Sequence, residues 1–145
     1  MAVKSEAEYL ILVTSRALGQ IGFTELQGGE LDRSVTEYPD PQLDASSYAV
    51  GTAKYSPLTL RVPFDPAKHD GFLSSIKTFC IGVVGDDIQV TIQPIKVCPD
   101  QTPDGKARIY SGCVPSKIKY PDVKRGTSGV SMLEIVLNPS QMKFA

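Results

Sequence analysis

Residues 22–39 read Gly-Phe-Thr-Glu-Leu-Gln-Gly-Gly-Glu-Leu-Asp-Arg-Ser-Val-Thr-Glu-Tyr-Pro, two extended segments that meet at Gly28-Gly29. Paired glycines between such segments predict a turn or bulge. If residues 30–38 form a strand, one face mixes apolar and charged side chains: Leu31, Arg33, Val35 and Glu37. The opposite face is polar: Asp32, Ser34, Thr36 and Tyr38. Neither face is strongly apolar, so this strand suits a sheet that is wet on at least one side.

Outward from this stretch, the chain alternates between strand-like segments and turn signals. Further strands are predicted at residues 8–15, 57–62, 87–98, 106–120 and 130–137, where large apolar or alternating residues recur. Pro94 interrupts the alternation of residues 87–98, and because proline donates no ladder hydrogen bond we expect a bulge or edge there. A hairpin turn is predicted at residues 99–105. Residues 39–53 are predicted to be a loop that is mobile or ordered on assembly.

One helix is predicted after Asp65, which can cap it, with Pro66 in the first helical position. An apolar stripe follows at helical spacing: Phe72, Leu73, Ile76, Phe79 and Cys80. This face should pack on a sheet, which makes Cys80 a candidate core residue. The single histidine, His69, is predicted to be exposed on this helix.

These elements predict a mainly β protein, an antiparallel β-sandwich or barrel with one flanking α-helix. The length of 145 residues fits a single domain over residues 1–145, with short flexible termini that include residues 138–145. No segment is apolar over the roughly 20 residues that a membrane span requires.

Signals for catalysis are poor, and we predict no enzymatic activity. The sequence has no GxSxG, P-loop, GxGxxG or HExxH pattern. With one histidine and no CxxC, the chain offers too few clustered ligands for zinc. No catalytic residue, metal site or cofactor is therefore predicted.

Three cysteines, Cys80, Cys98 and Cys113, cannot all pair within one chain. A bond between Cys98 and Cys113 is disfavoured, because the hairpin would place them several residues apart. Two interpretations stay open: one or more of the three forms an inter-subunit disulfide, or all are free thiols.

Charge is unevenly distributed along a chain whose formal net charge is only −1. Residues 1–44 hold eight acidic and three basic side chains, and the remainder holds eight acidic and twelve basic ones. The asymmetry could attract one surface of a subunit to another surface of its neighbour. The alternative is uneven but solvated surface charge.

Three stretches together resemble the tail tube proteins of contractile-tailed bacteriophages. The first is residues 22–40, with an aromatic-Xaa-Glu, the glycine pair and an acidic strand that ends in Glu37-Tyr38. The second runs from Lys54-Tyr55 through residues 58–60 into the helix. The third is residues 111–122, followed by a strand at residues 132–137. The likeness rests on their order and spacing; the Pro94 slip and the cysteines depart from the family pattern.

The resemblance implies a structural subunit that forms hexameric rings stacked into a tube, located in the virion tail and assembled in the host cytoplasm. Extended hairpins would join an inter-subunit barrel around a channel that conducts DNA without binding it. The implied partners are copies of the chain, a tail sheath protein, and baseplate and tail terminator proteins. The candidate channel-lining or early-hairpin residues are Glu25, Glu30, Asp32, Ser34, Thr36 and Glu37. The acids among them either repel DNA phosphates or face the sheath or solvent.

Two other functions fit the same residues. One is a tube protein of a type VI secretion or related contractile injection system, which would share the fold and differ in cargo. The other is a monomeric β-sandwich binding module, which would need a concave site with clustered aromatic side chains. The aromatic residues here are scattered and none is tryptophan.

Overall fold

Antiparallel strands dominate the computed structural model, which describes residues 9–15, 19–39, 46–81, 88–96, 102–126 and 129–145. A single helix, α1 (Pro66–Cys80), accompanies the strands. The strands are β1 (Tyr9–Ser15), β2 (Gly19–Phe23), β3 (Glu25–Gly28), β4 (Leu31–Pro39), β5 (Ser46–Tyr55), β6 (Leu58–Pro63), β7 (Ile88–Lys96), β8 (Thr102–Pro103), β9 (Arg108–Lys119), β10 (Met132–Asn138) and β11 (Gln141–Phe144). The predicted fold class, mainly β with one helix, is confirmed.

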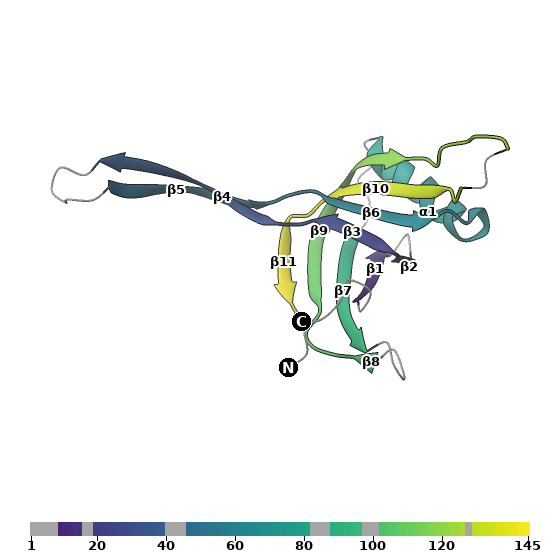
Figure 1. Ribbon diagram of the computed structural model, residues 1–145, viewed down its shortest axis with the longest axis horizontal. Helices are drawn as coiled ribbons and strands as arrows, with labels where there is room; N and C mark the ends of the chain where they lie inside the picture. The colour runs from purple at the N-terminus through teal and green to yellow at the C-terminus, as the bar shows by residue number, and fades with distance from the viewer. Residues whose placement is uncertain (1–8, 16–18, 40–45, 82–87, 97–101, 127–128) are drawn as a thin grey trace.

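The main sheet curls back on itself around the long strand β9. Its strand order is β2-β1-β7-β9-β10-β6-β3, with β11 added to β9 and β8 added to β7. The two ends of this path, β2 and β3, are separated in sequence by Thr24 alone, whose N–H donates to the carbonyl oxygen of Arg61 at 3.1 Å. The chain connection therefore holds the two ends of the sheet together in a half-open barrel (Figure 1).

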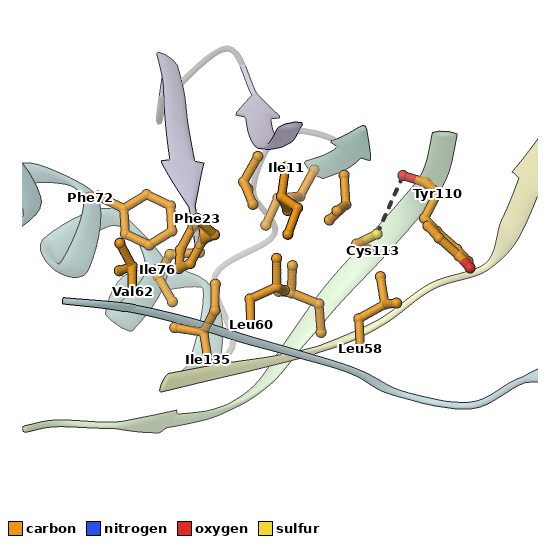
Figure 2. Close-up of a cluster of buried hydrophobic side chains, with 14 of the residues drawn as sticks. Ile11, Phe23, Leu58, Leu60, Val62, Phe72, Ile76, Tyr110, Cys113 and Ile135 are labelled. Atoms are coloured by element: carbon orange, nitrogen blue, oxygen red, sulfur yellow. Dashed lines mark hydrogen bonds between the residues drawn. The ribbon is translucent and has the colours of Figure 1, made fainter. Parts of the chain in front are cut away.

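Alternating side chains from both halves of the curled sheet form the core (Figure 2). The fully buried aliphatic residues come from β1, β6, α1, β7 and β10: Val13, Leu58, Leu60, Ile76, Ile88, Val90, Leu133, Ile135 and Leu137. Phe23 and Phe72 meet edge to face, with ring centroids 5.9 Å apart. Each fully buried aliphatic side chain contributes about 1.5–3 kcal/mol relative to exposure.

The helix begins as predicted, with the Asp65 Oδ1 accepting a hydrogen bond from the Ala67 N–H at 3.1 Å. The prediction of an exposed His69 is wrong. His69 precedes Phe72 by three residues and Leu73 by four, so it shares their buried face. Its Nδ1 accepts the Asp65 N–H at 3.0 Å. The placement of Cys80 in the core is also wrong, because Cys80 ends the helix and is exposed; the side chain of Phe79 is outside the described part.

Two segments predicted to be irregular are strands instead. Most of the predicted loop at residues 39–53 belongs to β5, which pairs with β4; residues 40–45 lie outside the described ones. The C-terminal tail forms β11, which pairs with β9 from Gln141↔Ser111 to Phe144↔Arg108. Hydrogen bonding to a partner distant in sequence orders both segments, and local patterns did not reveal those partners.

Pro94 marks an interruption of strand pairing, as its missing N–H predicts. On one of its edges, β7 pairs with β9 as far as Ile92↔Arg108. Beyond Pro94, the same edge pairs with β8. The Pro94 carbonyl oxygen accepts the Asp104 N–H at 2.8 Å. The register shift of β7 lies between Ile88 and Val90, so of the two predicted alternatives at Pro94, a bulge or an edge, the structure shows an edge toward β9.

Candidate functional site

A two-stranded arm, β4 with β5, extends away from the curled sheet (Figure 1). Within the described residues these strands pair only with each other, and every residue of β4 is exposed. A hairpin alone is at best marginally stable in water, so such an arm is expected to gain contacts from another surface.

The pairing of β4 with β5 gives the arm one apolar and one polar face. Cross-strand pairs share a face, and Leu31↔Tyr55, Val35↔Val50 and Glu37↔Tyr48 lie on the same side. The apolar face comprises Leu31, Val35, Tyr48, Val50 and Tyr55, and it also carries Arg33 and Glu37. The first four are more than half exposed, Val50 least at 53% and Tyr48 most at 62%. The polar face carries Asp32, Ser34, Thr36 and Tyr38, with Lys54 opposite Asp32.

The root of the arm is fixed to the core. Tyr55 packs edge to face on Tyr110, with ring centroids 6.1 Å apart, and the buried Tyr110 Oη donates to the Gly29 carbonyl oxygen at 3.1 Å. The Ser56 N–H donates to the Glu30 carbonyl oxygen at 2.9 Å. Tyr55 belongs to the apolar face, so that face contacts the core at this residue, whereas Leu31, Val35, Tyr48 and Val50 on the same face are more than half exposed.

We expect Tyr110→Phe to lower the free energy of unfolding by about 1–3 kcal/mol, because the buried Gly29 carbonyl oxygen loses this donor. Thermal unfolding would show a decrease of about 3 °C per kcal/mol for a domain of this size. Tyr120→Phe is the control, since Tyr120 is exposed. Equal melting temperatures for the two variants would contradict the role given to Tyr110.

A second surface is the outer face of the half-sheet β9-β10-β6-β3. The registers place four charged side chains in one row across it, in the order Glu25, Arg61, Glu134, Lys119. Arg61 Nη1 lies 3.3 Å from Glu25 Oε1, and Arg61 Nε lies 3.5 Å from Glu134 Oε2. We call these four residues the charged row; acid and base alternate along it.

The sequence-predicted site residues divide among these surfaces. Glu25 belongs to the charged row, whereas Asp32, Ser34 and Thr36 share the polar face of the arm. Glu37 lies on the opposite, apolar face. Glu30 lies at the root, where its N–H donates to the Ser56 Oγ at 2.9 Å. Sequence reasoning missed Tyr48, Val50, Arg61, Glu134 and Lys119, and only the alternation around Tyr48 and Val50 gave any signal.

Two of the three candidate disulfide cysteines lie among the described residues. Cys113 is buried, and its Sγ lies 3.6 Å from the Tyr110 carbonyl oxygen, so a bond to another chain would require opening the core. Cys80 is exposed and stays a candidate. Cys98 lies outside the described residues.

We expect the Cys80 thiol to react slowly, because partial burial raises its pKa and so leaves less thiolate. Its alkylation rate should reach half of its maximum at a pH above the ordinary thiol pKa of about 8.5. Site-resolved mass spectrometry of native and denatured protein measures this difference.

The inter-subunit disulfide is tested by gel electrophoresis. If Cys80 forms it, a dimer band in non-reducing gels should disappear in the variant Cys80→Ser. A monomer band in all lanes, reducing and non-reducing, would contradict the disulfide hypothesis.

The described part of the chain has few features of a metal site, a membrane-spanning segment or a reactive cavity. No group of histidine, cysteine and acidic side chains there could hold a metal ion. No helix among those residues has the length and apolar character to cross a bilayer. The cavity beside His69, about 480 Å³, is also lined by Asp65 and Lys68. The His69 Nδ1 already accepts a hydrogen bond from the Asp65 N–H, so this histidine stabilises the start of the helix.

The curled sheet with its helix and arm is a fold that also occurs in chains of solved contractile injection system assemblies. It superposes on a chain of the 6-fold-symmetrised anti-feeding prophage baseplate, with a TM-score of 0.77, 12% identity and coverage of 100% of this chain and 97% of that chain. A chain of the PVC sheath-tube complex in its extended state gives a TM-score of 0.76 at 18% identity, over 96% and 88% of the two chains.

The likeness extends to a type six secretion system protein, with a TM-score of 0.58, 7% identity and coverage of 94% of this chain and 82% of that chain. No protein-family model and no curated protein matches the sequence. The resemblance to tube proteins of contractile systems that residues 22–137 indicated is thus confirmed at the level of the fold.

Proposed function

We propose that this chain is the structural subunit of a phage tail tube, which forms hexameric rings that stack around a channel for DNA. The observation that carries the proposal is the arm, whose apolar face is anchored to the core at Tyr55 and exposed beyond it. A tube fold with such an arm needs another copy to cover that face. The role is structural and involves no catalysis.

In this proposal the apolar face of the arm packs on a neighbouring copy, and its polar face turns to the channel together with the charged row. The acids of these surfaces have basic neighbours: Asp32 lies opposite Lys54, and Glu25 pairs with Arg61. A channel surface of balanced charge releases few counterions on contact with DNA, so it does not hold the DNA in transit. Balanced charge is one hypothesis for DNA passage, and repulsion of DNA phosphates by the acids Glu25, Glu30, Asp32 and Glu37 is the other.

The further partners of the proposal are a sheath protein, a tube terminator and a baseplate, which would place the chain in a virion tail assembled in the host cytoplasm. Structural neighbours occur in a sheath-tube complex, in a tube-terminating cap and in a baseplate. These assemblies support such contacts for this chain.

A tube of a related injection system is the second candidate. It is favoured by the higher TM-scores with the anti-feeding prophage and the extracellular contractile injection system, 0.77 and 0.76, than with the type six secretion system protein, 0.58. The two candidates differ in cargo. Isolation of particles that contain the chain separates them, because a phage particle carries nuclease-protected DNA above its tail and an injection system does not.

Electron microscopy of the purified chain, combined with mass photometry, tests the tube itself. We expect six-fold rings and stacked tubes at high protein concentration. A stable monomer at all concentrations, with a small-molecule ligand, would instead support a monomeric binding module.

A further inference from the structure

One ring nitrogen of His69 makes no hydrogen bond to any described residue. The side chain is 5% exposed, and its Nδ1 accepts the Asp65 N–H at 3.0 Å. A neutral imidazole has one acceptor and one donor nitrogen, so this bond leaves the proton on Nε2. The Phe64 ring lies beside the imidazole, with ring centroids 5.9 Å apart, and helps to fix its orientation. His69 therefore holds a buried N–H donor that has no acceptor within the described part of the chain.

This donor lies on the cavity of about 480 Å³ between β2, the end of β6 and the start of α1. Among the described residues, Ser111 Oγ is the one side-chain polar atom that is sealed from solvent without a partner, so the His69 Nε2 is open to the cavity. β2 and α1 lie at the end of the molecule away from the arm (Figure 1). The described lining residues are partly apolar and partly polar: Ile21, Gly22, Val62 and Pro63, then Gln20, Asp65, Lys68 and His69.

The backbone at the start of the helix is already satisfied. The N–H groups of Lys68 and His69 donate to the Asp65 carbonyl oxygen at 3.1 and 2.9 Å. The Ala67 N–H donates to the Asp65 Oδ1 at 3.1 Å, and Pro66 has no N–H. A ligand in the cavity would therefore be bound by side chains and not by the helix backbone.

Three side-chain donors line the cavity: the His69 Nε2–H, the Lys68 ammonium group and the Gln20 amide. The one acid among the described lining residues is Asp65, whose Oδ1 accepts the Ala67 N–H and whose charge Lys68 offsets. A carboxylate has two oxygens that only accept, so it can satisfy several donors at once, whereas a neutral amide would bring N–H groups of its own. A short aliphatic chain on the carboxylate would lie against the apolar part of the lining.

We propose that this cavity binds a carboxylate group on a short aliphatic chain, with the His69 Nε2–H as its buried donor and Lys68 as its counter-charge. A buried N–H without an acceptor costs free energy, and a hydrogen bond to an ionised acceptor is about twice as strong as one to a neutral acceptor. A free carboxylate or an acidic side chain of another protein supplies this chemistry. The site shares no residue with the arm or the charged row and does not depend on the proposed tube.

Saturation-transfer NMR on the full chain tests the site, with butyrate as the probe and butyramide as its neutral match. We expect butyrate to bind with a Kd on the order of 1–10 mM, within reach of a ligand of about six heavy atoms, and butyramide to bind at least about tenfold more weakly. A capped peptide with one glutamate between two leucines separates the two sources. Tighter binding than butyrate assigns the site to an acidic side chain, and equal or weaker binding assigns it to a free carboxylate. Equal binding of butyrate and butyramide, or no saturation transfer to either, would overturn the proposal.

Three variants locate the binding. His69→Asn removes the Nε2–H and keeps an acceptor near the Asp65 N–H, so butyrate should bind at least about tenfold more weakly. Lys68→Gln should weaken binding about threefold, and because Lys68 is exposed this variant tests the site even if His69→Asn does not fold. Lys77→Gln is the matched control, since Lys77 is exposed in the last turn of the same helix and does not line the cavity. Unchanged affinity in folded His69→Asn or in Lys68→Gln, or an equal loss in Lys77→Gln, would overturn the proposal.

Discussion

A chain carrying Val35→Asp and Val50→Asp is expected to remain a folded monomer and to lose ring assembly by more than about a hundredfold. The two valines face each other across the arm and are more than half exposed. If assembly buries both, each contributes about 1.5 kcal/mol, and about 1.4 kcal/mol corresponds to a factor of ten. Carboxylates buried in their place add a further desolvation cost. Sedimentation velocity measures the shift from rings to monomers.

The matched control is Thr36→Asp with Ala49→Asp. This pair is next along the arm and lies on the opposite, polar face. It adds the same charge to the same two strands, so it separates the face from the effect of charge on the hairpin. An equal loss of assembly in both variants would show that the arm does not act through its apolar face.

The second large effect is expected for Gly28→Ala, which should destabilise the fold by more than about 2 kcal/mol. Gly28 has φ +93°, where an L-residue is strained by about 1–2 kcal/mol. A Cβ at this position would also clash with the carbonyl oxygen of Pro57, a backbone atom directly before β6 that can move only with the strand. Urea denaturation measures the loss, and assembly should weaken too because the root of the arm shifts.

Gly126→Ala is the control for backbone strain. Gly126 also has a positive φ, +84°, but a Cβ added there would meet no atom within 4 Å. It should cost only the strain, about 1–2 kcal/mol at most. Similar losses for the two variants would show that the contact with Pro57 is unimportant to the fold.

Local patterns in the sequence predict several strands of the curled sheet and the helix well. Alternation reveals β6 and β7, and Asp65-Pro66 with the stripe from Phe72 reveals the helix. Local patterns fail to predict burial where it depends on which other element packs against a residue. His69 is buried because the helix face extends one turn before the stripe, and Cys80 is exposed because that buried face ends before it.

The candidate site was predictable only in part. The sequence predicted an unusual strand at residues 30–38, because neither of its faces is apolar enough for a core; the structure has β4 at Leu31–Pro39. The division of this strand into an apolar and a polar face could not be predicted, because Glu37 and Thr36 are both polar residues in the sequence. The register with β5 places them on opposite sides.

The order of residues alone predicts local features: the strand periods, the helix start, and the turn at Gly28-Gly29. The pairing of Val35 with Val50 follows from the folded chain alone, as does the single row that contains Glu25, Arg61, Glu134 and Lys119. These features need the fold because strand pairing joins residues far apart in the chain. The apolar area and the charge pattern of a sheet face belong to several strands together, and no single strand contains them.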